Sequence, residues 1–243
     1  MPPSAVNSIT SQLELTMGTR LGTKPRKRNR RPFTPIVQPT TPAKVMDKTI
    51  DWTRCIPFLM MHAAILFVFV VGVSPIALIV AGLTYSLRVF GLTGFYHRYF
   101  SHRSFKTSRW FQFVGAFIGS SAAQRGPLWW AAHHRRHHRE SDQPEDVHSP
   151  VQHGFFWSHV GWFLNRENYD TDVRQIKDFW RFPELRMLDR HTYLAPIALA
   201  VSMYALGELI QYVAPSWNTN GWQMLVWGFV VSTIATYHIT YCI

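Results

Sequence analysis

Four long apolar blocks constrain the fold of this chain more than any other feature. They cover residues 56–73, 76–95, 193–214 and 222–243, and a helix that crosses the hydrocarbon core of a bilayer needs about 20 residues. Short segments at Ser74-Pro75 and at residues 215–221 separate the blocks within each pair. The blocks predict an all-α integral membrane protein with four transmembrane helices in two hairpins, near residues 53–73, 75–96, 192–214 and 222–243.

The charges support this topology. Only 16% of the 243 residues are charged, against about 25% in soluble domains. The net charge of +11 would suggest a nucleic-acid partner on a soluble fold. However, 24 of the 25 Lys and Arg residues precede residue 55 or lie between residues 97 and 190, and Arg88 is the exception. The positive-inside rule then places the N-terminus and the middle region in the cytoplasm and both hairpin turns outside. Membrane lipid is the expected partner, and nucleic acid is not.

The N-terminal segment has a different composition. Residues 1–48 are rich in Pro, Thr, Lys and Arg and include the basic run Lys24–Arg31. Such a segment buries no core, so we expect it to be disordered and attracted to anionic lipid. Residues 49–243 then form one membrane domain. Its two cysteines, Cys55 and Cys242, match neither a disulfide framework nor a zinc pattern.

A fifth block, residues 110–130, is also apolar. If it crossed the membrane, the histidine clusters on either side of it could not share a metal site. Its short apolar core, its Gly and Ser content and the sequence Gln124-Arg-Gly-Pro127 favour a helix at the interface or packed within the protein. We predict that it does not span.

Those two histidine clusters are His97-Arg-Tyr-Phe-Ser-His102 and His133-His134-Arg-Arg-His137-His138. Imidazole is the commonest neutral metal ligand. On a helix, His134, His137 and His138 project from one face, whereas residues five apart, such as His97 and His102, point about 140° apart. The latter two can converge where the helix ends or bends, or they can serve two metals. A solvated basic surface is the alternative, but the preceding apolar segments favour a metal site.

These motifs resemble a known family. Tyr96–Arg103 resembles the first histidine box, and Trp129–Arg139 the second box, of membrane fatty acid desaturases of the acyl-CoA (stearoyl-CoA, delta-9) type. Phe155–Trp162 matches the segment that follows the second box, and Asp146–Pro150 is similar to bacterial members. The resemblance extends from about Trp52 to the end of the sequence.

The resemblance implies four membrane helices, a cytoplasmic helical cap and a di-iron centre. It also implies O2-dependent insertion of a cis double bond into a saturated acyl chain, with no catalytic residue beyond the metal centre. The matching ligands are His97, His102, His134, His137 and His138, and weaker substrate contacts are implied for Gln124 and Trp130. His133 is expected beside the site or on the surface. The histidines outside the motifs are expected to be structural or exposed: His148, His153, His159 and His191.

The implied partners are a fatty acyl-CoA or acyl-lipid and an electron donor, such as ferredoxin or cytochrome b5 with its reductase. A bacterial inner membrane is favoured over the endoplasmic reticulum. The family has further ligands after its fourth helix, in an Asn-x-x-x-His segment and a third box, His-Asn-x-His-His. The sequence ends at Tyr237–Ile243, where these motifs are expected to begin, and His238 in a span is no substitute for them. We therefore expect the 243-residue chain to bind iron weakly, if at all, and not to desaturate. A version extended through both motifs is expected to convert saturated C16 or C18 acyl chains to monounsaturated ones.

Other readings stay open. Soluble di-iron proteins use paired Glu-x-x-His helices, but the one match here, Glu145–His148, lies between two prolines. Histidine-box hydroxylases and ketolases share the ligand spacing, and a catalytically incomplete membrane remnant is also consistent with the sequence. Zinc transport requires carboxylates or histidines within the spans, where His62, Glu208 and His238 are the candidates. We interpret His62 as a histidine packed within its helix.

Overall fold

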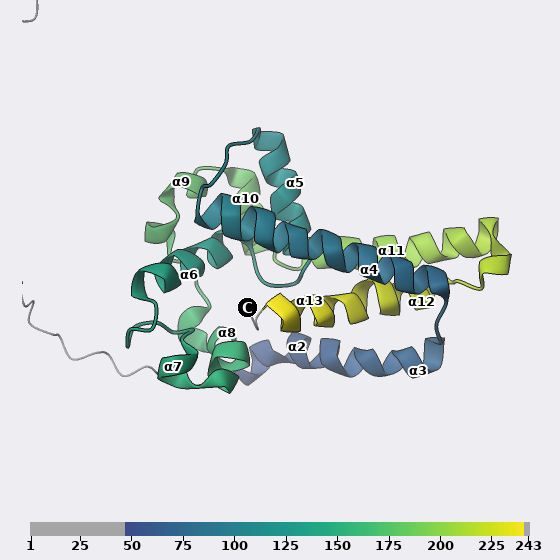
Figure 1. The fold of residues 1–243 in the computed structure, drawn as a ribbon, viewed down its shortest axis with the longest axis horizontal. Coiled ribbons are helices and arrows are strands. Elements are labelled where there is room, and N and C mark those ends of the chain that lie inside the picture. The colour runs from purple at the N-terminus through teal and green to yellow at the C-terminus, as the bar shows by residue number, and fades with distance from the viewer. Residues whose placement is uncertain (1–46, 241–243) are drawn as a thin grey trace, which may run out of the picture. The chain divides into compact units, whose positions relative to one another are not determined.

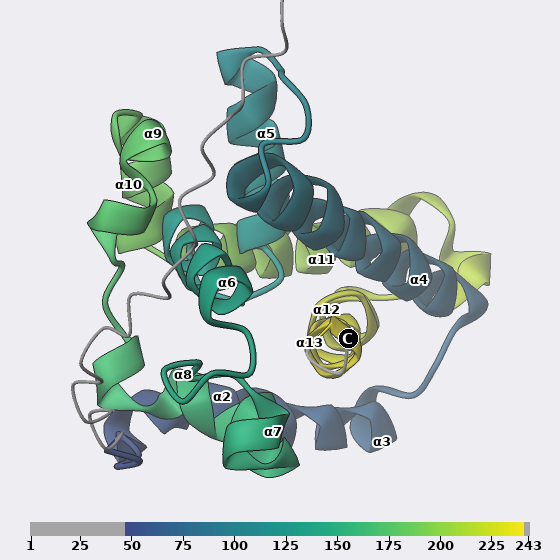
Figure 2. The same cartoon turned by 60° about the vertical axis from the view of Figure 1, so that its left-hand side comes forward.

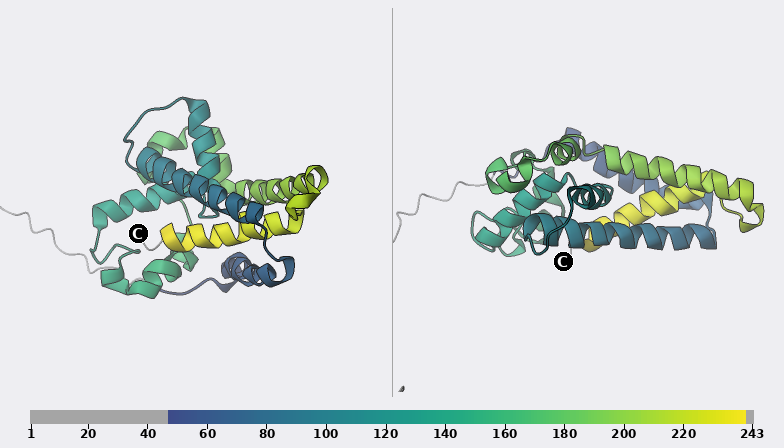
Figure 3. Two further views of the ribbon diagram at one scale, coloured as in Figure 1. Left: turned by 45° about the vertical axis from the view of Figure 1, so that its right-hand side comes forward. Right: turned by 90° about the horizontal axis from the view of Figure 1, so that it is seen from above.

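A computed structural model describes residues 47–240. Most of the predicted N-terminal segment, the last residues of the predicted fourth span and Cys242 therefore lie outside the described residues. Within residues 47–240 the secondary structure is helical, apart from an isolated bridge between Ile50 and Asn165. The long helices run alongside one another, and the shorter helices gather at one end of them to form the cap (Figures 1 and 3).

The first hairpin follows from local sequence signals. Its first helix comprises α2 (Trp52–Ala64), η1 (Ile65–Phe67) and α3 (Val68–Val71), and it begins where the Asp51 side chain accepts a hydrogen bond from the Arg54 amide. Gly72, with a φ of 68°, ends this helix. Ser74 and Pro75 then start α4 (Pro75–Phe90), which continues into η2 (Gly91–Ser101). Serine before the first turn and proline within it are typical of a helix start.

The second hairpin comprises α11 (Leu194–Val213), the short η6 (Pro215–Trp217) and a continuous helix over residues 221–240. That last helix consists of α12 (Gly221–Leu225), η7 (Val226–Val231) and α13 (Ser232–Thr240). A 2.8 Å hydrogen bond joins the hydroxyls of Ser74 and Thr219, so the turns of both hairpins lie at the same end of the long helices.

Three of the described helices are long and apolar enough to cross a membrane: Trp52–Val71, Pro75–Ser101 and Leu194–Val213. The helix over residues 221–240 is more polar, and it packs between the other long helices (Figure 2). Its Ser232 and Thr233 hydroxyls accept hydrogen bonds from the buried guanidinium of Arg88. Polar groups in a membrane domain are tolerated where they face protein, which explains how this helix carries them.

The cap contains the helices between the hairpins. The block at residues 110–130 is divided between α5 (Arg109–Ser120) and α6 (Pro127–Glu140), and the 12 residues of α5 are too few to span a bilayer. The remaining cap elements are α7 (Pro150–His153), η3 (Trp157–Gly161), α8 (Trp162–Leu164), η4 (Arg166–Asn168), η5 (Val173–Gln175), α9 (Lys177–Trp180) and α10 (Pro183–Arg190).

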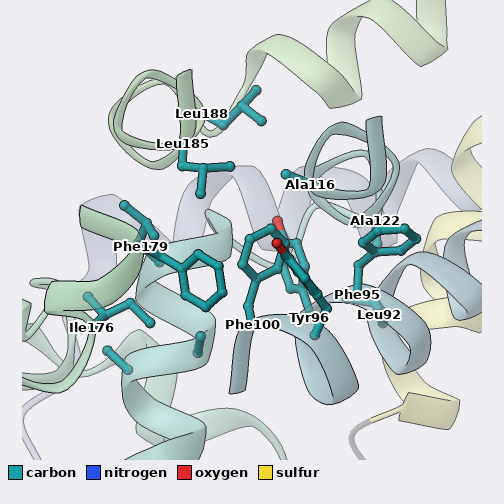
Figure 4. Packing of buried hydrophobic residues seen from close by; sticks show 14 residues of the cluster. Leu92, Phe95, Tyr96, Phe100, Ala116, Ala122, Ile176, Phe179, Leu185 and Leu188 are labelled. Atoms are coloured by element: carbon teal, nitrogen blue, oxygen red, sulfur yellow. The ribbon is translucent and has the colours of Figure 1, made fainter. Parts of the chain in front are cut away.

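The core of the cap packs around the end of η2. Tyr96 and Phe100 are fully buried there, and they lie with Phe179 of α9 and with Leu185 and Leu188 of α10 (Figure 4). This core fixes the segment that carries the first histidine cluster against the rest of the cap.

Candidate metal centre and adjoining cavity

The first histidine pair depends on an unusual helix. η2 is a π-helix, in which backbone hydrogen bonds join residues five apart, and the amide of His102 donates to the carbonyl of His97 at 3.1 Å. The wider turn brings these side chains onto one side, so that their Nε2 atoms are 3.2 Å apart. The bend needed to bring His97 and His102 together is therefore built into the helix.

The second pair lies on α6. His134 and His138 are one turn apart, and their Nε2 atoms are 2.9 Å from each other. The His134 ring stacks on the ring of Trp130, with the two ring centroids 4.7 Å apart. The start of this helix is held by Asp189 of α10, whose Oδ1 accepts hydrogen bonds from the amides of Leu128 and Trp129 at 3.1 and 2.8 Å.

The two pairs meet in one four-histidine group. Each of His97, His102, His134 and His138 offers a ring nitrogen, and these atoms all lie within 4.8 Å of one another. Burial, followed by repulsion from neighbouring imidazoles, lowers the pKa of His134 to about 2, and burial also lowers the pKa of His138. Both rings are therefore neutral near pH 7, which is the form that binds a metal. The donor set suits iron, zinc, copper or nickel.

His137, the fifth predicted ligand, lies outside this group. Its Nδ1 is 3.0 Å from Oδ1 of Asp146, a carboxylate that is almost fully buried and also accepts from the amides of Asp142 and His148. This hydrogen bond raises the pKa of His137. Burial alone would raise the pKa of Asp146, but the hydrogen bonds it accepts lower it. The carboxylate orients the ring and leaves Nε2 available, an arrangement that is usual for metal ligands.

A cavity of about 290 Å³ adjoins the histidines. Both predicted substrate contacts line it, and Gln124 donates a 2.7 Å hydrogen bond to the Thr240 hydroxyl. The lining includes Leu92, Thr93, His97, Gln124, Trp129, Trp130, His133, His134, His137, His148, Trp162 and Thr240. Its exposed area is largely apolar, as is usual for small-molecule sites, and its polar groups are the histidines together with Thr93, Gln124, Arg136, Asp146 and Thr240.

The remaining histidines lie elsewhere or have other partners. His133 bonds to the Trp129 carbonyl, and burial lowers its pKa to about 4. His238 bonds through its two ring nitrogens to His62 and His159, at 3.0 Å each, so His62 contacts more than its own helix. His191 contacts the Tyr193 hydroxyl.

Three residues of the site were not predicted from the sequence. His148 lines the cavity, although it lies outside the histidine boxes, and burial lowers its pKa to about 4. Asp146 and Thr240 act through contacts with His137 and Gln124. Asp146 lies nine positions after His137, and no repeating pattern in the sequence indicates that these two side chains are in contact.

Comparison with known proteins identifies the family of the chain. The model of the family described as fatty acid desaturase matches residues 73–242. The chain is 32% identical over 200 residues to an sn-1 stearoyl-lipid 9-desaturase of Anabaena variabilis, covering 80% of this chain and 67% of that protein. It is 31% identical over 156 residues to a chloroplastic palmitoyl-monogalactosyldiacylglycerol delta-7 desaturase of Arabidopsis thaliana, covering 63% and 38%.

A third relative, the acyl-CoA 5-desaturase AL21 of Anemone leveillei, is 31% identical over 163 residues, covering 64% of this chain and 45% of that protein. The chain thus spans between 38% and 67% of the length of these relatives. The family model covers well over half of the chain, including both histidine clusters. The chain therefore belongs to the fatty acid desaturase family.

Proposed function

We propose that this protein introduces a cis double bond into a saturated fatty acyl chain of 16 or 18 carbons, using O2 and two irons. The observation that carries the proposal is the four-histidine group beside a largely apolar cavity, in a chain of the desaturase family. The overall reaction converts CH2–CH2, O2, two electrons and two protons into CH=CH and two waters. A ferredoxin, or cytochrome b5 with its reductase, would supply the electrons.

The residues fit a metal centre of this kind. His97, His102, His134 and His138 would hold one iron, and His137, oriented by Asp146, would contribute to the second. Iron would supply the oxidising power for removing hydrogen from an unactivated methylene, which no side chain can supply. The protein would bind the acyl chain along Trp130 and past the hydrogen-bonded side chains of Gln124 and Thr240, which line the same cavity.

The names of the relatives support two substrate carriers. Two of them are named for acyl-lipid substrates and one for acyl-CoA. We propose an acyl-lipid or acyl-CoA substrate here. The test supplies purified, iron-loaded protein with reductant, electron carrier, O2 and labelled stearoyl substrate on each carrier. A monounsaturated product supports the proposal, a hydroxylated product indicates a hydroxylase, and absence of product with iron bound indicates a remnant.

The membrane arrangement extends this proposal. Four spans, with residues 221–240 as part of the fourth, would place the cap and its histidines in the cytoplasm. The spans themselves would lie in a bacterial inner membrane. The shared position of both hairpin turns supports this topology, as does the absence of Lys and Arg from the turns.

Cysteine labelling tests the topology. Val73→Cys and Asn218→Cys replace exposed turn residues, and we expect an impermeant maleimide to label both from outside intact cells. The control, Arg174→Cys in the exposed part of the cap, should react only after the membrane is opened. Labelling of either turn only after opening would contradict four spans.

A further inference from the structure

Arg135 lies between the two histidines His134 and His137 on α6, and its side chain leaves the helix toward the first histidine cluster. A guanidinium has five N–H donors, and here each has an acceptor. Nε donates to the Ser101 carbonyl at 3.1 Å, and Nη2 to the Phe100 carbonyl. Nη1 donates to the Gln175 carbonyl at 2.8 Å, and the Asp178 carboxylate receives one bond from each Nη atom at 2.9 Å.

Two of these acceptors are backbone carbonyls next to the candidate ligand His102, so a shift of this backbone would move the ligand. Phe100 and Ser101 end the η2 helix directly before His102, and the last carbonyls of a helix lack partners within it. Their partial negative charge favours a cation. The bonds from Arg135 therefore join the backbone beside His102 to the helix that carries His134 and His138.

We propose that Arg135 is a positioning residue that sets the distance between the His97–His102 pair and the His134–His138 pair, and so the metal affinity of the group. This inference rests on the proposed metal site. Lysine keeps the charge but cannot reproduce the planar, bidentate contact, so Arg135→Lys is an informative change. Arg139→Lys is the matched control, because Arg139 lies on the same helix and, within residues 47–240, bonds to the side chains of Gln175 and Glu140 rather than to the η2 backbone.

The experiment titrates detergent-purified protein with Co²⁺, and it records the dissociation constant and the visible absorption of bound cobalt. Loss of a residue that orients a ligand typically weakens metal binding 10–100-fold. We expect a loss of about that size and an altered spectrum for Arg135→Lys, and neither for Arg139→Lys. Equal affinity and an unchanged spectrum in Arg135→Lys would overturn the proposal.

Two further measurements keep the outcomes distinct. If Arg135→Lys loses its helical circular dichroism, Asp178→Asn tests the proposal instead. This change leaves the three backbone acceptors of Arg135 in place, so it should weaken cobalt binding in the same direction but by a smaller factor. If the unmodified protein binds no cobalt, the metal proposal fails. Hydrogen exchange of amides 97–104 then tests the positioning role, with faster exchange expected in Arg135→Lys than in Arg139→Lys, and equal exchange counting against it.

Discussion

Replacing His134 with glutamine should weaken metal binding by more than ~100-fold. Changes to groups around a ligand already cost 10–100-fold in affinity, and His134 is itself a member of the four-histidine group. Burial and neighbouring imidazoles keep its ring neutral, and stacking on Trp130 fixes its plane. Glutamine has an amide in place of this neutral ring nitrogen, so the group should retain three imidazole donors.

Two histidine controls separate this effect from a general loss of histidine. His133→Gln changes the adjacent residue, which bonds to a backbone carbonyl outside the group, and it should retain the metal content of the unmodified protein. His191→Gln alters a histidine that contacts the Tyr193 hydroxyl, and it should also retain that metal content. Metal analysis of the purified variants is the measurement. Full metal content in His134→Gln would show that the group is not the binding site.

Much of this architecture could be predicted from the sequence, because hydropathy and charge act over long segments. The first, second and third predicted spans correspond to helices long and apolar enough to cross a membrane. The fourth is less clear from hydropathy, since its polar residues face protein: Ser232 and Thr233 accept from Arg88. Such a compensating contact joins residues about 145 positions apart and leaves no local pattern.

The candidate site could likewise be predicted from the sequence only in part. The spacing of His134 and His138 predicts their pairing, because the α-helix repeats every 3.6 residues. His97 and His102 are paired on a π-helix, a rare form that their spacing alone does not indicate. Its residues Tyr96 and Phe100 are buried in the cap core. His137, apart from the other four, bonds to Asp146, which lies in a loop where it also accepts from the amides of Asp142 and His148. Sequence reasoning therefore identified the candidate ligands, but not their division into a group of four and one separate histidine.

Replacing Gly126 with alanine should destabilise the protein by about 2–5 kcal/mol, combining overpacking of ~1–3 kcal/mol with loss of a helix cap of ~1–2 kcal/mol. A Cβ atom at this position would lie 2.3 Å from Oδ1 and 2.4 Å from Cα of Asp189. Because backbone is involved, α10 would have to move. That movement would break the hydrogen bonds from the Leu128 and Trp129 amides to Asp189 at the start of α6.

The Asp189 carboxylate makes the loss larger. Burial already raises its pKa, and the bonds from Thr171, Trp129 and Leu128 offset part of that effect. Without the amides, the carboxylate would be buried with fewer partners, which is costly.

Denaturant unfolding in detergent measures the change in the free energy of unfolding. Gly82→Ala is the control, because a Cβ there has no other atom within 4 Å, and alanine favours a helix by up to about 1 kcal/mol over glycine. Asp189→Ala isolates the cap from the steric clash and should cost less than Gly126→Ala. If Gly126→Ala were as stable as Gly82→Ala, the contact between α10 and the start of α6 would not hold the histidine helix in place.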